Sequence, residues 1–237
     1  MSILTNALGA ILKFIYQSFQ SLGPEPSNVS YYALALITMA VLQKIITMPL
    51  TLKGTKNAQR GQELNPQVEA IRKKYANDPN TQNKKIMELY KEHNYNPASG
   101  CLPMLIPIII IFAMLNVIRN PGNYMLDNAS QIHEIAKNFL WVPDLSNADP
   151  YIYGLPLIYA VSMFAYSSIM QSQQPAGDDR MKSMNMTMKF MMPVMMFIFA
   201  RSWPSGMILF WASSNIVELV ARTVIKFFIK EKGETAS

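Results

Sequence analysis

Residues 31–50, YYALALITMAVLQKIITMPL, decide the structural class of this protein, because they contain a single charged side chain, Lys44. A helix of about 20 residues is long enough to cross a hydrocarbon core of about 30 Å. Residues 99–118, 150–177 and 202–217 carry no charge at all. Charged residues make up only 15% of the 237-residue chain, against about 25% in soluble domains. The sequence therefore predicts an all-α integral membrane protein.

Polar segments separate the apolar stretches and divide the chain into predicted elements of one domain, residues 1–237. Residues 1–24 carry apolar side chains at helical spacing and lack the early positive cluster of a signal peptide, so we expect a retained amphipathic helix at the membrane interface. A turn centred on Asp78 and Pro79 predicts a helical hairpin over residues 54–95. Five membrane-spanning helices are predicted over residues 31–50 (ended by Pro49), 97–118, 151–171, 183–202 and 207–229. Residues 119–150 form an external segment, with a short helix expected near 130–139.

The basic residues predict how the chain is oriented, because cytoplasmic segments of membrane proteins are rich in Lys and Arg. If the N-terminus lies outside, 16 of the 21 Lys and Arg residues are cytoplasmic and four are external. The remaining one, Lys44, lies within a span. We therefore expect an external N-terminus, a cytoplasmic C-terminus and a cytoplasmic hairpin.

Lys44 is the most informative position, because a cation within a span costs about 2.5–3.5 kcal/mol on insertion scales. By its helical position it lies about 10 Å from the cytoplasmic surface. Two interpretations stay open, since Lys44 could be a functional group within the membrane or could extend its side chain to the lipid headgroups. Gln43 and Thr47 are polar residues of the same span.

A second polar group lies in the last predicted span, where Asn215 and Glu218 are three residues apart and share a helix face. Lipid would not tolerate these groups together with Lys44, which favours a water-filled cavity lined by both spans. The alternative for Glu218 is a local pair with Arg222, four residues further along the helix.

The sequence contains no signature of an enzyme. It has no glycine-rich phosphate loop and no G-x-S-x-G motif. His93 and His133 fall on opposite sides of the membrane in the predicted topology, so they could not share a metal ion. The single cysteine, Cys101, excludes an internal disulfide. We expect no catalytic residue, no metal site and no cofactor.

Several short motifs, taken in order, resemble those of the YidC insertases, the bacterial relatives of the mitochondrial Oxa and chloroplast Albino proteins. The resemblance extends from about Leu12 to Phe228 and is to the short, Gram-positive-like form. The motifs are KIITMPL at 44–50, LNP at 64–66, NPASGCLP at 96–103, FLW at 139–141, DPY at 149–151, MMP at 191–193, PSG at 204–206 and LFW at 209–211.

This resemblance implies five helices around a hydrophilic groove that is open to the cytoplasm and to lipid. Lys44 stands where most members have arginine, and Pro107 where members often have glutamine. The groove residues that would bind substrate are Lys44, Gln43, Thr47, Trp211, Asn215 and Glu218. The implied partners are nascent membrane proteins, the lipid bilayer of the bacterial plasma membrane, the ribosome and the Sec translocon, with no small-molecule substrate.

The implied mechanism is physical. A nascent helix with a short polar or acidic outer segment enters the groove, Lys44 attracts the negative segment, and the helix then moves sideways into lipid. Two other functions stay open: an ion channel or small-solute transporter that uses Lys44 and Glu218, and a chaperone that only assists helices beside the Sec translocon.

Overall fold

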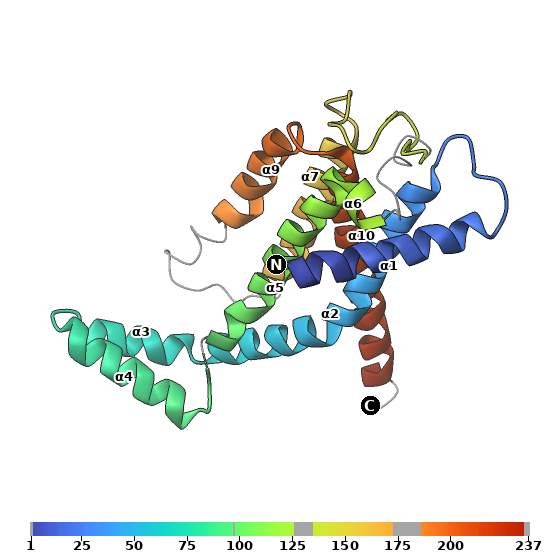
Figure 1. Cartoon of the computed structure of the whole chain (residues 1–237). Coiled ribbons are helices and arrows are strands. Elements are labelled where there is room, and N and C mark those ends of the chain that lie inside the picture. The colour runs from blue at the N-terminus through green and yellow to red at the C-terminus, as the bar shows by residue number, and fades with distance from the viewer. Residues whose placement is uncertain (1, 97, 126–134, 173–185, 235–237) are drawn as a thin grey trace.

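The regular secondary structure is helical throughout the part of the chain that the structure, a computed structural model, describes: residues 2–96, 98–125, 135–172 and 186–234. Figure 1 shows the first helix, α1 (Ser2–Gln20), lying across the longer helices rather than alongside them. It buries Leu12, Ile15 and Tyr16 against the rest of the molecule and leaves Ile3 and Phe14 exposed. The exposed apolar side chains suit a helix that lies in a membrane interface.

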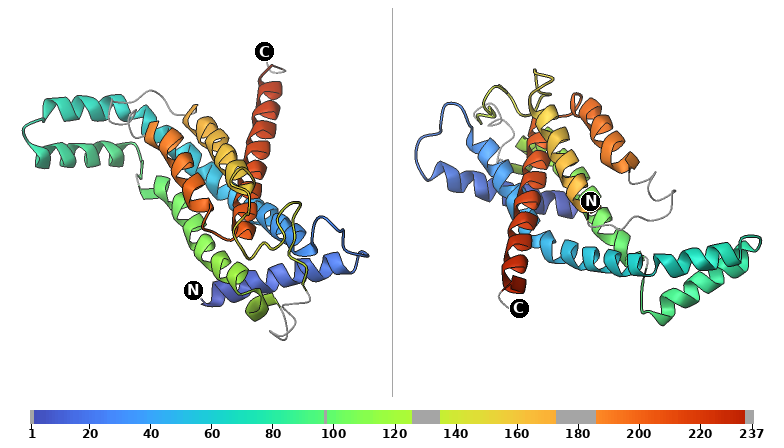
Figure 2. Two further views of the ribbon diagram at one scale, coloured as in Figure 1. Left: turned by 90° about the horizontal axis from the view of Figure 1, so that it is seen from above. Right: turned by 180° about the vertical axis from the view of Figure 1, so that it is seen from behind.

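The second helix, α2 (Tyr31–Glu63), runs far beyond the predicted end of the first span. The prediction that Pro49 ends this helix is wrong, because Pro49 lies inside it. Hydroxyls on both sides of the proline bond to the helix carbonyls: Thr47 Oγ1 donates to Gln43 O (2.9 Å) and Thr51 Oγ1 to Thr47 O (3.0 Å). Such bonds help a helix to accommodate a proline. Figures 1 and 2 show α2 bent between its apolar first half and its basic second half, as an internal proline predicts.

Two short helices, α3 (Asn65–Lys74) and α4 (Pro79–Glu92), lie side by side and project from the end of α2 (Figures 1 and 2). Val68 and Leu89 are buried and form the apolar contact that this arrangement needs. Asp78 caps α4 by accepting a hydrogen bond from the Thr81 backbone N–H at 3.1 Å. The hydrogen bonds from Thr81 hold the pKa of Asp78 below its usual range.

The remaining helices are α5 (Ala98–Arg119), α6 (Pro121–Met125), α7 (Leu155–Ser172), the π-helix η2 (Thr187–Met191), α9 (Met192–Ala200) and α10 (Ser205–Glu234). Two described stretches have the length and hydropathy of a membrane span, Tyr31–Gly54 and Ser205–Val224. Shorter apolar helical stretches, Ile109–Arg119, Leu155–Ile169 and Lys189–Ala200, overlap the second, third and fourth predicted spans.

The external segment differs from its prediction. Part of the helix expected near 130–139 falls outside the described residues, and residues 135–139 are not helical, whereas α6 occupies 121–125. The third predicted span begins at Leu155 rather than 151, because Asp149 holds the preceding turn. Its carboxylate accepts hydrogen bonds from the Leu155 backbone N–H (2.7 Å) and the Trp141 indole (3.1 Å). A Cβ on Gly154 would lie 2.4 Å from that carboxylate, so the turn needs glycine.

Residues 135–154 cover the end of the bundle that contains Tyr31 and Ser205, which we name the capped end. Val142 and Leu145 of this segment are fully buried. The Asn147 carbonyl accepts hydrogen bonds from both the backbone N–H and the hydroxyl of Ser205, each at 2.7 Å. The Gly206 N–H donates to Leu145 O at 2.8 Å. An irregular segment thus closes this end with buried apolar side chains and paired backbone groups.

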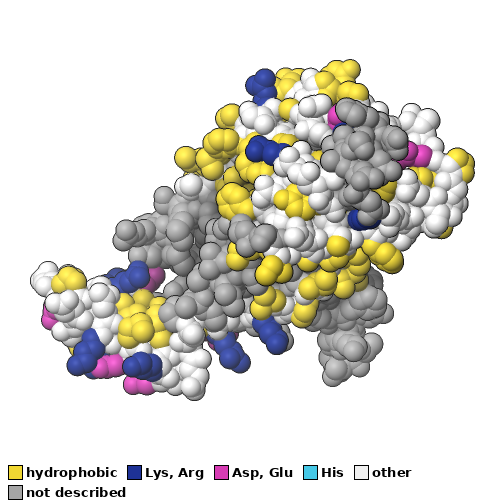
Figure 3. All heavy atoms as spheres, in the orientation of Figure 1, with side chains coloured by type: hydrophobic (Ala, Val, Ile, Leu, Met, Phe, Trp, Pro, Cys, Tyr) yellow, Lys and Arg dark blue, Asp and Glu magenta, His cyan; other side chains and the backbone are white. Residues whose placement is uncertain are grey.

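The surface is divided by residue type (Figure 3). Lys and Arg side chains gather over α3, α4 and the second half of α2, while apolar side chains lie over α1 and α9. The exposed apolar residues of α9 include Val194, Ile198 and Phe199. Large exposed apolar side chains on a helix are expected where the helix faces lipid rather than water.

Candidate functional site

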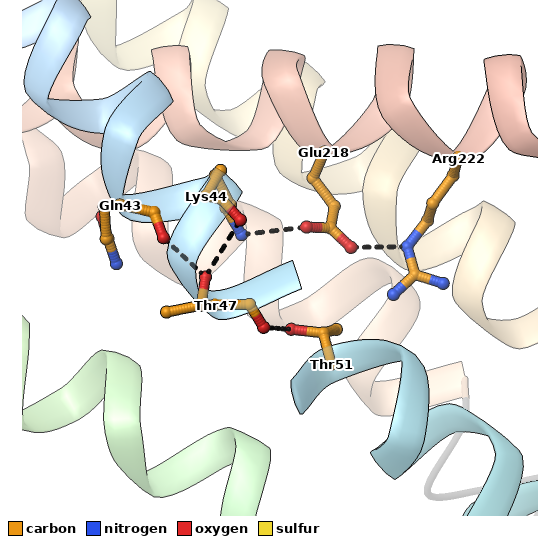
Figure 4. Close-up of polar contacts among 6 residues, drawn as sticks. All are labelled: Gln43, Lys44, Thr47, Thr51, Glu218 and Arg222. Carbon is orange, nitrogen blue, oxygen red and sulfur yellow. Dashed lines mark hydrogen bonds and ion pairs between the residues drawn. The ribbon is translucent and has the colours of Figure 1, made fainter. Parts of the chain in front are cut away.

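Lys44 of α2 and Glu218 of α10 face each other, although 174 positions separate them in the sequence. The Lys44 Nζ lies 3.3 Å from Glu218 Oε2, and the Arg222 Nε donates to Glu218 Oε1 at 2.6 Å (Figure 4). Each carboxylate oxygen therefore has its own cation. The local pair of Glu218 with Arg222 that the sequence suggests is present, and Glu218 also pairs across the helices with Lys44.

This three-residue cluster is largely removed from solvent. The side chains of Glu218 and Arg222 are 4% and 7% exposed, whereas that of Lys44 is 20% exposed and forms the open side. Two cations and one carboxylate leave a net charge of +1 when all three are ionised. Removing an ion from water costs roughly several kcal/mol unless partners compensate its charge. The surplus cation of this buried cluster therefore favours the approach of an anion or of water.

Gln43 and Thr47 lie beside Lys44 on α2 but take different positions. Figure 4 shows Gln43 on the side of α2 away from Glu218, and its Oε1 is buried without a hydrogen-bond partner. The Thr47 hydroxyl is one turn along and is bonded to the backbone carbonyl of Gln43. The structure therefore brings Lys44 and Glu218 together. It places Gln43 and Thr47 beside Lys44, and Figure 4 draws no bond from either of them to Glu218.

Asn215 and Trp211 both contact α7. The Asn215 Nδ2 donates to Ser162 Oγ at 3.3 Å, and Ser162 in turn donates to Tyr159 O at 2.8 Å. The Trp211 ring packs on Tyr159 with centroids 5.6 Å apart, and its indole N–H is buried without a partner. Asn215 and Glu218 have different bonding partners, because Asn215 bonds to Ser162 of α7 whereas Glu218 pairs with Lys44 of α2.

Sequence reasoning did not include Arg222 among the site residues. The signal was available, since Arg222 follows Glu218 by four residues, but it suggested only a local pair. Ser162 and Ser168 of α7 were also missed; the Ser168 hydroxyl is buried and has no hydrogen-bond partner among the described residues. Serine is too common in apolar helices to mark a site by its type alone.

The described residues contain no group of three or more His, Cys, Asp or Glu side chains that could hold a metal ion. The chemical content of the site is therefore an ion cluster, neighbouring amide and hydroxyl groups, and an apolar surround. This arrangement can attract and hold an anionic group.

Comparison with known proteins gives matches over most of the chain. Residues 26–232 match the family described as 60Kd inner membrane protein. The membrane protein insertase YidC of Fusobacterium nucleatum is 34% identical over 98% of this chain and 100% of its own length. The YidC of Clostridium perfringens is 33% identical over 80% of this chain and 76% of its own length.

Other relatives are longer. The YidC of Treponema denticola is 33% identical over 94% of this chain, which spans only 38% of that protein. A crystal structure of an active YidC insertase, with its first transmembrane domain resolved, superposes with a TM-score of 0.61 at 25% identity. That likeness covers 92% of this chain and 46% of the crystallised one.

Proposed function

The chain belongs to the YidC family of membrane protein insertases, whose function is membrane protein insertion, and we propose that it inserts its clients through a hydrophilic groove beside Lys44. The observation that carries the groove is the ion cluster, in which Lys44 meets Glu218 and Arg222 between α2 and α10. Gln43 and Thr47 extend the polar surface along α2. Asn215 and Trp211 border it toward α7.

The physical basis of insertion is a lower cost for polar groups at membrane depth. A polar or acidic segment of a nascent chain cannot enter pure hydrocarbon without losing its hydration. Water around Lys44 offers such a segment hydrogen bonds, and the net positive charge of the cluster attracts carboxylates. The apolar helix of the client then moves into lipid, which its own hydrophobic surface favours. No nucleotide or cofactor is needed for these steps.

The two ends of the bundle give the proposed groove its direction. The capped end, closed by residues 135–154, is the external side, and the end with Lys44 and Glu218 opens to the cytoplasm. Five spans follow if the shorter apolar helices overlapping residues 97–118, 151–171 and 183–202 also cross the bilayer of the bacterial inner membrane. The N-terminus is then external and the C-terminus cytoplasmic, with α1 lying at the external interface.

The helix pair α3–α4 supplies a cytoplasmic surface for arriving chains. It carries many of the basic side chains, and it is attached to the groove by the continuous helix α2. A basic, exposed helix pair suits contact with anionic lipid, ribosomal RNA or acidic regions of a partner. Nascent membrane proteins are the substrates of this family, and the ribosome and the Sec translocon are the further partners that we propose.

The test is insertion by the purified full-length chain in liposomes, without Sec components or nucleotide. The client is a single-span protein with a short acidic tail, and protection of that tail from added protease measures insertion. We expect protection above the level of empty liposomes, and equal levels would reject the function. A matched control is Arg201→Gln, which removes an exposed cation near the capped end and should leave insertion unchanged.

The same liposomes distinguish the insertase from a channel. We expect no ion flux when the client is absent, since the capped end is closed by buried apolar side chains. A steady flux without client, abolished by Lys44→Gln, would assign Lys44 and Glu218 to an ion path instead.

A further inference from the structure

Arg222 is the most buried cation of the cluster, and one of its guanidinium nitrogens has no partner among the described residues. The residue is 8% exposed. Its Nε donates to Glu218 Oε1, whereas its Nη2 is buried and makes no hydrogen bond to the part of the chain that the structure describes. Figure 4 draws the contact with the Glu218 carboxylate at the Arg222 Nε and draws none at the two terminal nitrogens. The Nη2 of Arg222 is therefore a charged hydrogen-bond donor that stays available beside the Glu218 carboxylate, which is already paired.

A buried N–H of a charged group is costly to leave unpaired, so its presence calls for an acceptor. The charge of the cluster makes the same demand, because Lys44 and Arg222 together exceed Glu218 by one positive charge. Both observations favour binding of one further anion. Glu218 itself shows which anion fits, since a carboxylate already bridges the two cations.

We propose that the guanidinium of Arg222 is a second binding position for the carboxylate of a client's acidic segment. The carboxylate of Glu218 already neutralises one of the two cations, so the site accepts only one further negative charge. The proposal rests on the insertase function proposed above. In this proposal Arg222 of α10 provides the planar, bidentate hydrogen-bond donor that the ammonium group of Lys44 on α2 cannot provide.

The charge count gives this proposal a quantitative consequence. One client carboxylate brings the cluster to neutrality, and a second would make it negative. The gain from acidic residues in a client tail is therefore expected to reach its limit at one residue. If Glu218 is replaced by glutamine, the cluster holds a charge of +2 and the limit moves to two residues.

The experiment measures binding of fluorescent single-span peptides, whose tails carry zero, one or two aspartates, to the full-length chain in neutral detergent. The first aspartate should tighten binding about tenfold, the contribution expected from one hydrogen bond to a charged group. The second should add less than about twofold in the wild type but about tenfold in Glu218→Gln, by the same reasoning. Equal gains from the first and second aspartate in the wild type would overturn the proposal.

Arg222→Lys separates the planar fork from the charge. It keeps the net charge of the cluster, so the limit of one aspartate should persist while the first gain falls to about threefold or less. Arg201→Lys is the matched control, because Arg201 is exposed and lies near the capped end, and its binding curves should equal the wild type. A full tenfold gain in Arg222→Lys would show that Arg222 does not contact the client.

Three further readouts keep the outcomes apart. If a variant still binds the peptide whose tail has no aspartate, the variant is folded. If a variant does not fold, the proposal is decided by the wild-type protein alone, in which the gain should stop at one aspartate. Displacement of the peptide by an equal concentration of inorganic phosphate would assign the position to a phosphate group, such as a lipid headgroup, and would overturn the carboxylate assignment. Binding with the expected limit but no insertion in liposomes would reject the proposed function and leave this inference standing.

Discussion

The capped end and the Lys44 end of the bundle use the same two helices, α2 and α10, for opposite purposes. At the capped end Tyr32, Leu36 and Phe210 are almost fully buried, and residues 135–154 close over them. At the other end Lys44, Glu218 and Arg222 form a charged cluster with an open side. Beyond it the helices diverge, as Figures 1 and 2 show.

The difference shows how one helix pair can be rigid and still expose polar groups at membrane depth. The apolar contacts that fix the distance between α2 and α10 are concentrated at one end. The charged residues at the other end therefore need not hold the helices together, which leaves them free for the role in client binding that we propose. Stability and function should respond to different mutations, and each prediction below tests that separation.

The largest effect is expected from Phe210→Ala at the capped end. Phe210 is 2% exposed, and truncating a buried phenylalanine typically costs about 3–5 kcal/mol. Thermal unfolding in detergent should show a much lower midpoint, and acidic and neutral clients should lose insertion equally. A selective loss for acidic clients would contradict the separation of the two ends.

Gly206→Val tests how tightly residues 135–154 close the capped end. A Cβ at this position would lie 3.1 Å from Leu145 O and 3.2 Å from Leu36 Cδ1, and valine adds two further methyl groups. Overpacking of this kind costs about 1–3 kcal/mol. We expect a lowered unfolding midpoint and easier protease cleavage within residues 135–154. Gly23→Val is the comparison for a glycine in open space, although its positive φ adds backbone strain.

Much of this arrangement could be predicted from sequence, for physical reasons that differ between regions. The helical class follows from long uncharged stretches, and Lys44 and Glu218 stand out because ionised groups are rare within spans. The family was recognisable from short motifs such as NPASGCLP at 96–103. These features depend on local composition, which the sequence displays directly.

Other features depend on tertiary contacts and could not be predicted. The sequence predicts that Pro49 ends a helix, but hydroxyls from Thr47 and Thr51 bond to carbonyls around it and the helix continues. Residues 135–154 have no periodic pattern, although Val142 and Leu145 are fully buried. The direction of Asn215 toward α7 depends on Ser162, which no spacing rule links to it.

At the other end, Lys44→Gln should leave the capped end intact. It removes one cation and makes the cluster neutral, so the attraction for an acidic tail should fall about tenfold, the weight of one hydrogen bond between charged groups. Insertion of a neutral-tailed client and the unfolding midpoint should change little, because Lys44 is partly exposed and contributes few buried apolar contacts. Lys44→Arg keeps the charge and should retain the preference for acidic tails.

The smallest effect is expected from Asn215→Ala, which lies between the two ends. Its loss removes the hydrogen bond to Ser162 Oγ, worth about 0.5–1.5 kcal/mol, and leaves that hydroxyl still bonded to Tyr159 O. Because this contact is uncharged and faces α7, the unfolding midpoint should fall slightly and insertion of acidic and neutral clients should fall together. Ser162→Ala also removes the bond to Tyr159 O, so its loss should be somewhat larger, and the double variant should lose no more than Ser162→Ala, since the bond to Asn215 is shared. A loss confined to acidic clients would instead extend the charged end one turn toward the capped end, and would place Asn215 in the same functional unit as Lys44 and Glu218.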